Sequence, residues 1–165
     1  MKKLIACLLG LLFLASAMAA GAEGGKWLNY RGAWFDIKYP AGFKVRPSQP
    51  STTSSAGYDG VFFRSPDATV EFYVFSPQWN GEPAGIRLKP ASEAYVSQNE
   101  EEKDGKKIRR ATIRAKNGSY LRSYEDIEDA STRRTFGIKY RDQAAYERYR
   151  QDYLTFKQSL TQYAD

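Results

Sequence analysis

The sequence contains no histidine, and its single cysteine is Cys7. Without histidine there is no Ser-His-Asp triad, no Cys-His pair and no imidazole ligand for a metal. The patterns Gly-x-Ser-x-Gly and Ser-x-x-Lys are missing, and so is any glycine-rich phosphate loop. These absences exclude the common nucleophilic, zinc-dependent and nucleotide-dependent mechanisms. We therefore expect a protein that is not an enzyme, with no catalytic residues, no metal site and no cofactor.

Carboxylates leave one catalytic alternative open. A glycosidase needs only two Asp or Glu residues, and the chain has 19. Such an enzyme also needs a deep cleft lined with aromatic side chains, which a domain of this size rarely contains. A small carboxylate-dependent hydrolase is therefore the alternative to a binding protein. A purely structural or stress-related envelope protein is the third interpretation.

The first twenty residues have the pattern of an export signal. Two lysines precede an apolar run over residues 4–14, and small residues follow over 15–20. This pattern predicts a secretory signal peptide over residues 1–19, cleaved near Ala19 or Ala20. It places the protein in the bacterial periplasm or the medium.

Two other interpretations of this segment fit less well. A membrane anchor needs about 20 apolar residues, but the run from Leu4 to Met18 has 15. No later segment is apolar enough to span a bilayer. A lipoprotein box, Leu4-Ile5-Ala6-Cys7, precedes most of the apolar run instead of following it. Cleavage near Ala20 would leave a chain with no thiol and hence no disulfide.

The remaining residues, 20–165, are predicted to form a single α+β domain. Tyrosine contributes 12 residues to an aromatic content of 15%, a composition that favours strands. Period-2 alternation and short apolar runs predict four strands, over 35–39, 43–46, 61–63 and 69–75. The last has two largely apolar faces, so we expect it to be covered on both sides. Pro47 to Ala56 is predicted to be an exposed loop, and Ser76 to Ala91 a long connection with room for one helical turn.

Turn signals divide the following segment into a meander. Asp104-Gly105 and Asn117-Gly118 are signatures of type I′ hairpin turns, and Asp129-Ala130-Ser131 is a softer turn. They predict strands over 93–103, 106–115, 119–127 and 133–140. Because successive hairpins place neighbouring strands antiparallel, these four strands should form an antiparallel sheet.

A long helix is predicted at the end of the chain. Asp142 is a typical N-cap residue, and apolar side chains recur at spacings of 3 and 4 from Tyr146 to Tyr163. The stripe would run along about 33 Å of helix at 1.5 Å per residue. A lone coiled coil is one interpretation. We favour a helix that docks onto the meander, because a sheet face needs a cover.

The order of these elements resembles a known fold group. Phe35-Asp36-Ile37-Lys38-Tyr39-Pro40 turns through Gly42 into Phe43-Lys44-Val45, and the meander and a helix with Phe156 and Leu160 on its buried stripe follow. From Trp34 to Tyr163 the chain resembles the Mog1/PsbP-like group. The resemblance implies an α/β/α sandwich, with an antiparallel sheet between helices.

The resemblance also implies a non-catalytic role. Known members of the group include an extrinsic photosystem II subunit, a protein that binds a small nuclear GTPase, and bacterial envelope proteins. Their partner-binding residues have no counterpart in this sequence, and an export signal argues against a nuclear role. We expect a binding or accessory protein of the envelope whose partner is a protein or an anionic envelope component, and not a nucleic acid.

Positive charge is concentrated in the meander. Lys106 to Arg141 contains eleven Lys+Arg and four Asp+Glu. The sequence hypothesis aligns three arginines across the Asn117-Gly118 hairpin and adds one from the last strand: Arg110, Arg114, Arg122 and Arg134. On one face they would form a patch for phosphates, lipid headgroups or an acidic protein. The alternative is a solvated sheet edge that resists aggregation through its charge.

Two further features have open interpretations. Trp79 lies among turn-forming residues, where it is either an exposed anchor for a partner or a lid folded back on the core, and we favour the lid. The acidic cluster from Glu125 to Asp129 has oxygen ligands suited to Ca²⁺. It lacks Asp-x-Asp-x-Asp-Gly spacing, so ion pairs with Arg133 and Arg134 are the favoured interpretation.

Overall fold

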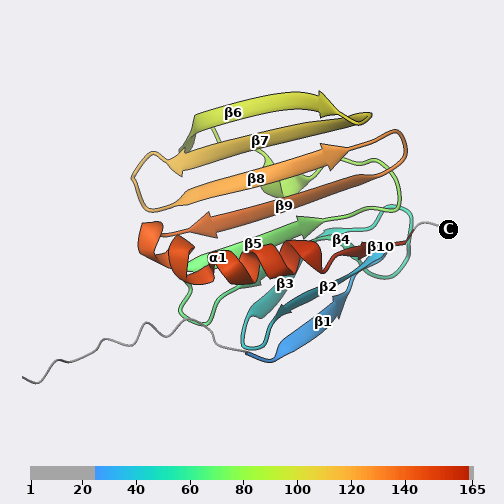
Figure 1. The fold of residues 1–165 in the computed structure, drawn as a ribbon, viewed down its shortest axis with the longest axis horizontal. Helices are drawn as coiled ribbons and strands as arrows, with labels where there is room; N and C mark the ends of the chain where they lie inside the picture. Colours follow the sequence, from blue (N-terminus) through green and yellow to red (C-terminus); the bar gives the residue numbers. More distant parts are fainter. Residues whose placement is uncertain (1–24, 164–165) are drawn as a thin grey trace, which may run out of the picture.

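The computed structural model describes residues 25–163 (Figure 1). The predicted signal peptide, its cleavage site at Ala19 or Ala20, and Cys7 lie outside the described residues. Within residues 25–163 the chain forms two antiparallel sheets, one α-helix and one 3₁₀ turn. No helix in this range is both long and apolar enough to cross a membrane.

The smaller sheet has the order β1-β2-β10 and the larger one the order β3-β4-β5-β9-β8-β7-β6. The smaller sheet consists of β1 (Trp27–Arg31), β2 (Phe35–Pro40) and β10 (Thr161–Gln162). The larger sheet consists of β3 (Lys44–Pro50), β4 (Tyr58–Arg64), β5 (Val70–Phe75), β6 (Glu93–Lys103), β7 (Lys106–Ala115), β8 (Leu121–Glu128) and β9 (Arg133–Tyr140). The 3₁₀ turn η1 (Ala84–Ile86) lies between β5 and β6, and the helix α1 (Gln143–Gln158) follows β9.

The predicted meander is confirmed, since β6, β7, β8 and β9 are neighbours in this order and all pair antiparallel. Asp104 and Gly105 have φ of 52° and 73°, as a type I′ turn requires. The type I′ prediction for the second hairpin is wrong. Only Gly118 has a positive φ there (73°), and its N–H donates to the carbonyl of Ala115 at 2.9 Å.

The strand predictions upstream of the meander are confirmed in part. β5 lies in the interior of the larger sheet, and five of its six residues are buried. The predicted loop from Pro47 is wrong at its start, because β3 continues to Pro50. β3 is an edge strand, where a residue without an N–H group is tolerated. β1 and the smaller sheet were not predicted.

The helix begins where predicted and ends earlier. The carboxylate of Asp142 accepts a hydrogen bond from the N–H of Ala145 at 2.8 Å, which confirms the N-cap. α1 ends at Gln158, so the prediction that it reaches Tyr163 is wrong. The hydroxyl of Ser159 accepts from the N–H of Lys38 at 2.9 Å, and the next residues pair with β2 as β10. This pairing at the edge of the smaller sheet replaces the last turns of the predicted helix.

The core lies between α1, the smaller sheet and one face of the larger sheet. α1 packs against β2, β5 and β9, and Figure 1 shows it in front of the larger sheet. Phe156 is fully buried, with its ring centroid 5.3 Å from those of Phe63 and Phe72. Docking of the helix on the sheet is therefore confirmed, together with the α+β class.

The opposite face of the larger sheet is covered only in part, by the connection between β5 and β6. Figure 1 shows η1 behind the sheet, on the side away from α1. The predicted helical turn in this connection is confirmed as η1. Among the described residues, α1 covers one face of the larger sheet. The opposite face, where the α/β/α sandwich has a second helical layer, is covered by a connection that contains the 3₁₀ turn η1 and no α-helix.

Candidate functional site

The larger sheet has two faces because successive side chains of a strand point to opposite sides. One face carries core residues such as Phe63, Phe72 and Phe136 and packs under α1. The other face, called the open face below, carries Phe62 and Tyr73. The predicted site residues are distributed over both faces.

Only one of the four predicted arginines lies on the open face. Arg114 pairs with Leu121, which contacts the core, whereas Arg122 pairs with Ile113 and Lys139. The predicted alignment of Arg110, Arg114 and Arg122 is therefore wrong. Paired residues share a face, and in this register every even-numbered residue of β7 pairs with an odd-numbered residue of β8. Even-numbered residues of the two strands, such as Arg114 and Arg122, therefore point to opposite faces.

The other three arginines lie on the α1 side of the sheet. Arg110 donates to Glu125 at 2.8 Å and to Glu101 at 2.5 Å, so two carboxylates compensate its charge. Arg134 pairs with Ile127 across β8 and β9 and is half-buried. Arg114 is exposed. These three residues are separated from Arg122 by the sheet itself.

Trp79 lies in the connection between β5 and β6, and 54% of it is exposed. The favoured interpretation of this residue as a lid over the core is therefore wrong. Trp79 is also absent from the lining of the cleft on the open face.

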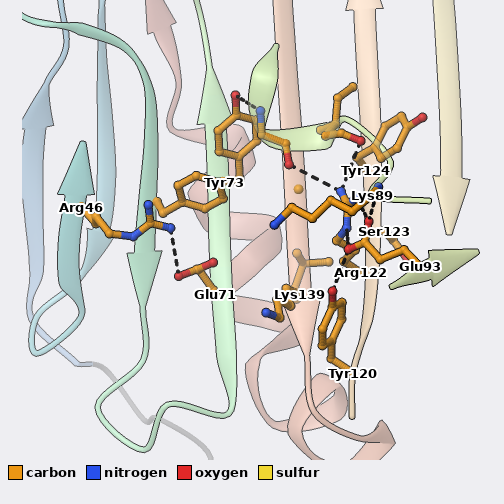
Figure 2. Close-up of a pocket in the computed structure, with 15 residues that line it drawn as sticks. Arg46, Glu71, Tyr73, Lys89, Glu93, Tyr120, Arg122, Ser123, Tyr124 and Lys139 are labelled. Atoms are coloured by element: carbon orange, nitrogen blue, oxygen red, sulfur yellow. Dashed lines mark hydrogen bonds and ion pairs between the residues drawn. The ribbon is translucent and has the colours of Figure 1, made fainter. Parts of the chain in front are cut away.

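A cleft of about 200 Å³ lies on the open face, above β4, β5, β8 and β9 (Figure 2). The strands contribute the aromatic side chains of Phe62, Tyr73 and Tyr124. The connection contributes Gly85 and Lys89 and forms one wall. The cleft combines apolar rings with charged groups, which is typical of sites for organic ligands.

Gly85 allows this wall to lie directly on the sheet. A Cβ atom added at Gly85 would be 2.4 Å from Cζ of Tyr73, which leaves no space for a side chain. The N–H of Gly85 donates to the hydroxyl of Tyr73 at 3.3 Å. Burial raises the pKa of Tyr73 well above its usual value of 10. Tyr73 is therefore a neutral residue that supports the wall.

Arg122 fastens the same wall through Glu93. Its guanidinium donates to both carboxylate oxygens of Glu93, at 2.9 and 2.7 Å, and to the carbonyl of Arg87 at 2.9 Å. Glu93 also accepts from the hydroxyl of Tyr120 at 2.7 Å and from the N–H of Lys89 at 2.9 Å. Burial alone would raise the pKa of Glu93, but these hydrogen bonds lower it to about 2.

The strand registers align a row of charged residues across the open face. Five residues pair in succession across β3, β4, β5, β9 and β8: Lys44, Arg64, Glu71, Lys139 and Arg122. We call this set the cationic row. It contains four cations and one carboxylate. Like charges directly opposite each other on neighbouring strands are destabilising.

Most of this positive charge is uncompensated. Among residues 25–163, no ion pair involves Lys44, Arg64 or Lys139. Glu71, the carboxylate of the row, is 3.6 Å from the guanidinium of Arg46. Figure 2 shows the ammonium groups of Lys89 and Lys139 pointing into the space between Glu71 and Arg122.

Lys139 lies at the centre of this charge. Its ammonium nitrogen is 4.0 Å from the centroid of the Tyr120 ring. Its pKa lies below the usual 10.5, first because the ammonium is partly desolvated. Glu71 opposes this effect, whereas repulsion from Lys89, Arg64 and Arg122 lowers the pKa further. An anion placed among these groups would offset their mutual repulsion by attraction.

The charges in another row of the open face, two rows from the cationic row, compensate one another. Asp126 pairs with Arg109, and Arg109 pairs with Glu100, so acidic and basic residues alternate. Asp126 also accepts two hydrogen bonds from the buried Arg133, at 2.9 and 2.8 Å, as the ion-pair interpretation of the acidic cluster predicts. Within residues 25–163 no group of three or more His, Cys, Asp or Glu is placed to hold a metal ion.

Sequence reasoning missed most of the site. The opposition of Arg122 and Lys139 could have been found by counting outward from the two turns that bound β8. The pairing of Arg64 with Glu71 is also local, because a short turn joins β4 to β5. The pairing of Glu71 with Lys139 joins strands that are far apart in the sequence, and Lys89 is placed by the path of the connection. For these last two features no local signal exists.

Comparison with known proteins gives a fold and no activity. No family model matches the chain, and no curated protein does. Among solved structures, the chain is similar to the solution structure of cyanobacterial PsbP (CyanoP) from Synechocystis sp. PCC 6803, with a TM-score of 0.51 and 11% identity. The match covers 93% of this chain and 100% of the cyanobacterial one. This likeness confirms the PsbP-like fold group that the sequence resembles.

Proposed function

We propose that this protein is an exported, non-catalytic binding protein of the bacterial envelope, and that it binds an anionic ligand in the cleft on the open face. The observation that carries this proposal is the uncompensated charge of the cationic row around Lys139. Elsewhere on the same face, as at Asp126 and Arg109, charges alternate and pair. A protein gains stability from an anion at such a place, because binding to the folded state alone lowers its free energy.

The two carboxylates of the cleft favour binding over catalysis. Glu93 accepts hydrogen bonds from Arg122 and Tyr120, and its pKa of about 2 keeps it ionised near neutral pH. A general acid needs the opposite, a carboxyl whose pKa is raised toward the working pH. Glu71 lies 3.6 Å from the Arg46 guanidinium. The carboxylate-dependent hydrolase therefore has less support than a binding protein.

Export is proposed from the sequence of the N-terminal segment. Its basic start, apolar run and small residues are those of a secretory signal peptide. N-terminal sequencing of the secreted or periplasmic protein should find a first residue of Ala20 or Gly21. An uncleaved chain, or a chain acylated at Cys7, would contradict this part of the proposal.

Anion binding is tested with pyranine, a fluorescent aromatic trisulfonate, by anisotropy titration at low ionic strength. Lys139→Glu reverses the charge of a cation that lines the cleft, and we expect the affinity of the variant for pyranine to fall at least about tenfold, or about 1.4 kcal/mol. Arg114→Glu makes the same charge change on the α1 side and is the matched control, with an expected change below about twofold. Circular dichroism checks that both variants are folded. Equal losses in the two variants would contradict the proposal, because binding would then depend only on net charge.

A further inference from the structure

The outer edge of β6 is a backbone surface without a partner strand. β6 is the last strand of the larger sheet (Figure 1), and among residues 25–163 it pairs only with β7. From Ser97 to Lys103 this pairing has no register shift. Because the Asp104-Gly105 turn makes Lys103 and Lys106 a hydrogen-bonded pair, the N–H and C=O groups of alternate residues of β6 point away from β7. These outward groups belong to Gln98, Glu100 and Glu102.

The opposite edge of the sheet is protected in ways that this edge is not. β3 contains Pro47 and Pro50 and two register shifts, which interrupt pairing with a further strand. β6 contains no proline, and its register shift at Val96 lies before the regular stretch. Every residue from Ser97 to Lys103 is exposed. This stretch therefore offers a regular, accessible edge to an extended segment.

Apolar side chains are exposed at the start of the same strand. Tyr95 is 42% exposed and Val96 is 52% exposed, and they are two of the five large hydrophobic residues exposed among the described residues. The two are neighbours in the sequence and lie directly before the regular stretch. Such adjacent apolar side chains beside a free edge are typical of a surface that another chain covers.

An acidic run lies along the regular stretch. Glu100 and Glu101 pair with cations of β7, of which Arg109 and Arg110 are shared with carboxylates of β8. Glu102 forms no ion pair within residues 25–163. The edge therefore keeps an excess of negative charge that a cationic partner could neutralise.

This charge argues against pairing between two copies of the chain. A symmetric antiparallel pairing over the whole stretch from Ser97 to Lys103 places the two copies of Glu100 opposite each other. Like charges in this position are destabilising, whereas opposite charges on neighbouring strands are stabilising. Charge complementarity therefore favours a basic segment over a second copy.

We infer that the outer edge of β6 binds an extended, basic segment of a partner protein, which adds to the larger sheet as an antiparallel strand. The outward backbone groups of β6 form its hydrogen bonds, as in other cases of strand addition. Its basic residues lie beside the run from Glu100 to Glu102, and the apolar residues that follow them contact Tyr95 and Val96. The inference goes beyond the proposed function, because residues 97–103 do not line the cleft.

The backbone part of the inference is tested with a synthetic heptapeptide, Lys-Arg-Lys-Thr-Val-Ile-Tyr, acetylated and amidated at its ends. Its order from basic to apolar matches an antiparallel strand on β6, and isothermal titration calorimetry at low ionic strength measures its affinity. Gln98→Pro removes an outward N–H and leaves the pairing with β7 intact, whereas Gln98→Ala loses the same side chain and keeps the N–H. We expect Gln98→Pro to bind the peptide at least about fivefold more weakly than Gln98→Ala. Equal affinities, or no binding of the peptide to the native protein, would overturn the inference.

A second pair of variants tests the role of charge. Glu102→Lys reverses a charge of the edge and should weaken peptide binding at least about threefold. Glu147→Lys makes the same change at an exposed position of α1 and is the matched control, with an expected change below about 1.5-fold. Circular dichroism checks that the variants are folded. Equal losses in the two variants would contradict binding at β6, since only net charge would then matter.

Sedimentation velocity distinguishes a foreign segment from a second copy. The native protein should sediment as a monomer at the concentrations of the titrations, because the acidic run opposes self-pairing. A dimer that Gln98→Pro dissociates would show that β6 pairs with itself, and the inference would be wrong.

Discussion

Glu93 provides a direct test of how the wall of the cleft is held. Only 3% of this residue is exposed, and Arg122 donates to both of its carboxylate oxygens. Its pKa falls from 4.5 to about 2 because the hydrogen bonds of the ionised form outweigh the cost of burial. A carboxyl group with this difference in pKa contributes about 3 kcal/mol to the free energy of unfolding when it is ionised.

The sign of the pH dependence follows from the lowered pKa. The contribution of Glu93 is complete above pH 4.5 and disappears as the pH falls through about 2. Between these limits the free energy of unfolding of the native protein should fall by about 1.4 kcal/mol per pH unit from this group alone. Glu93→Gln cannot ionise, so the variant should lack this part of the slope.

Urea-induced unfolding, followed by circular dichroism, measures the difference between the two proteins. At about pH 6, Glu93→Gln should be less stable by about 3–5 kcal/mol, because Arg122 loses its charged partner in a largely buried place. At about pH 3 the difference should be smaller by roughly 2 kcal/mol. Glu102→Gln, on the exposed part of β6, is the control for loss of a surface carboxylate. A difference between native protein and Glu93→Gln that stays constant with pH would refute the reasoning.

Three further predictions concern packing. Phe156→Ala should lower the free energy of unfolding by about 3–5 kcal/mol in urea titrations, because the ring is fully buried; a loss below about 1 kcal/mol would contradict docking of α1. Asp126→Ala removes the buried carboxylate partner of Arg133 and leaves it only the exposed Glu82, so it should cost about 3–5 kcal/mol by the same assay, whereas a neutral effect would contradict a structural ion pair. Gly85→Ala should move η1 away from Tyr73 and weaken pyranine binding in anisotropy titrations. Gly25→Ala, which has open space around it, should not. Equal affinity of these two variants would show that the wall does not shape the cleft.

The parts of the fold that the sequence predicted are those specified by local signals. Asp104-Gly105 has the backbone conformation that its residue types favour, and the strands on either side have the predicted bounds. The Asp142 N-cap likewise depends on one side chain and one N–H group three residues later. Such signals act within a few residues, so they can be recognised before the chain is folded.

Features that depend on distant pairing could not be predicted. β10 has two residues and forms because β2, more than a hundred residues earlier, offers a free edge. The spacing of apolar residues extended the predicted helix past Gln158 because Leu160 fits the helical period. Leu160 does pack on the core, but from a position beyond the end of α1. The candidate site has the same origin, because the registers of five strands bring its residues together. Sequence analysis found the excess of positive charge but placed Arg110 and Arg114 on the wrong face.

The location of the bound anion tests the account most directly. Two-dimensional ¹H–¹⁵N NMR spectra of the protein can be recorded during titration with pyranine. We expect the largest chemical-shift changes at backbone amides of the cationic row, around Arg64, Glu71, Lys139 and Arg122. Changes centred instead on Arg110 and Arg114, or on the indole of Trp79, would contradict binding in the cleft and place the anion elsewhere.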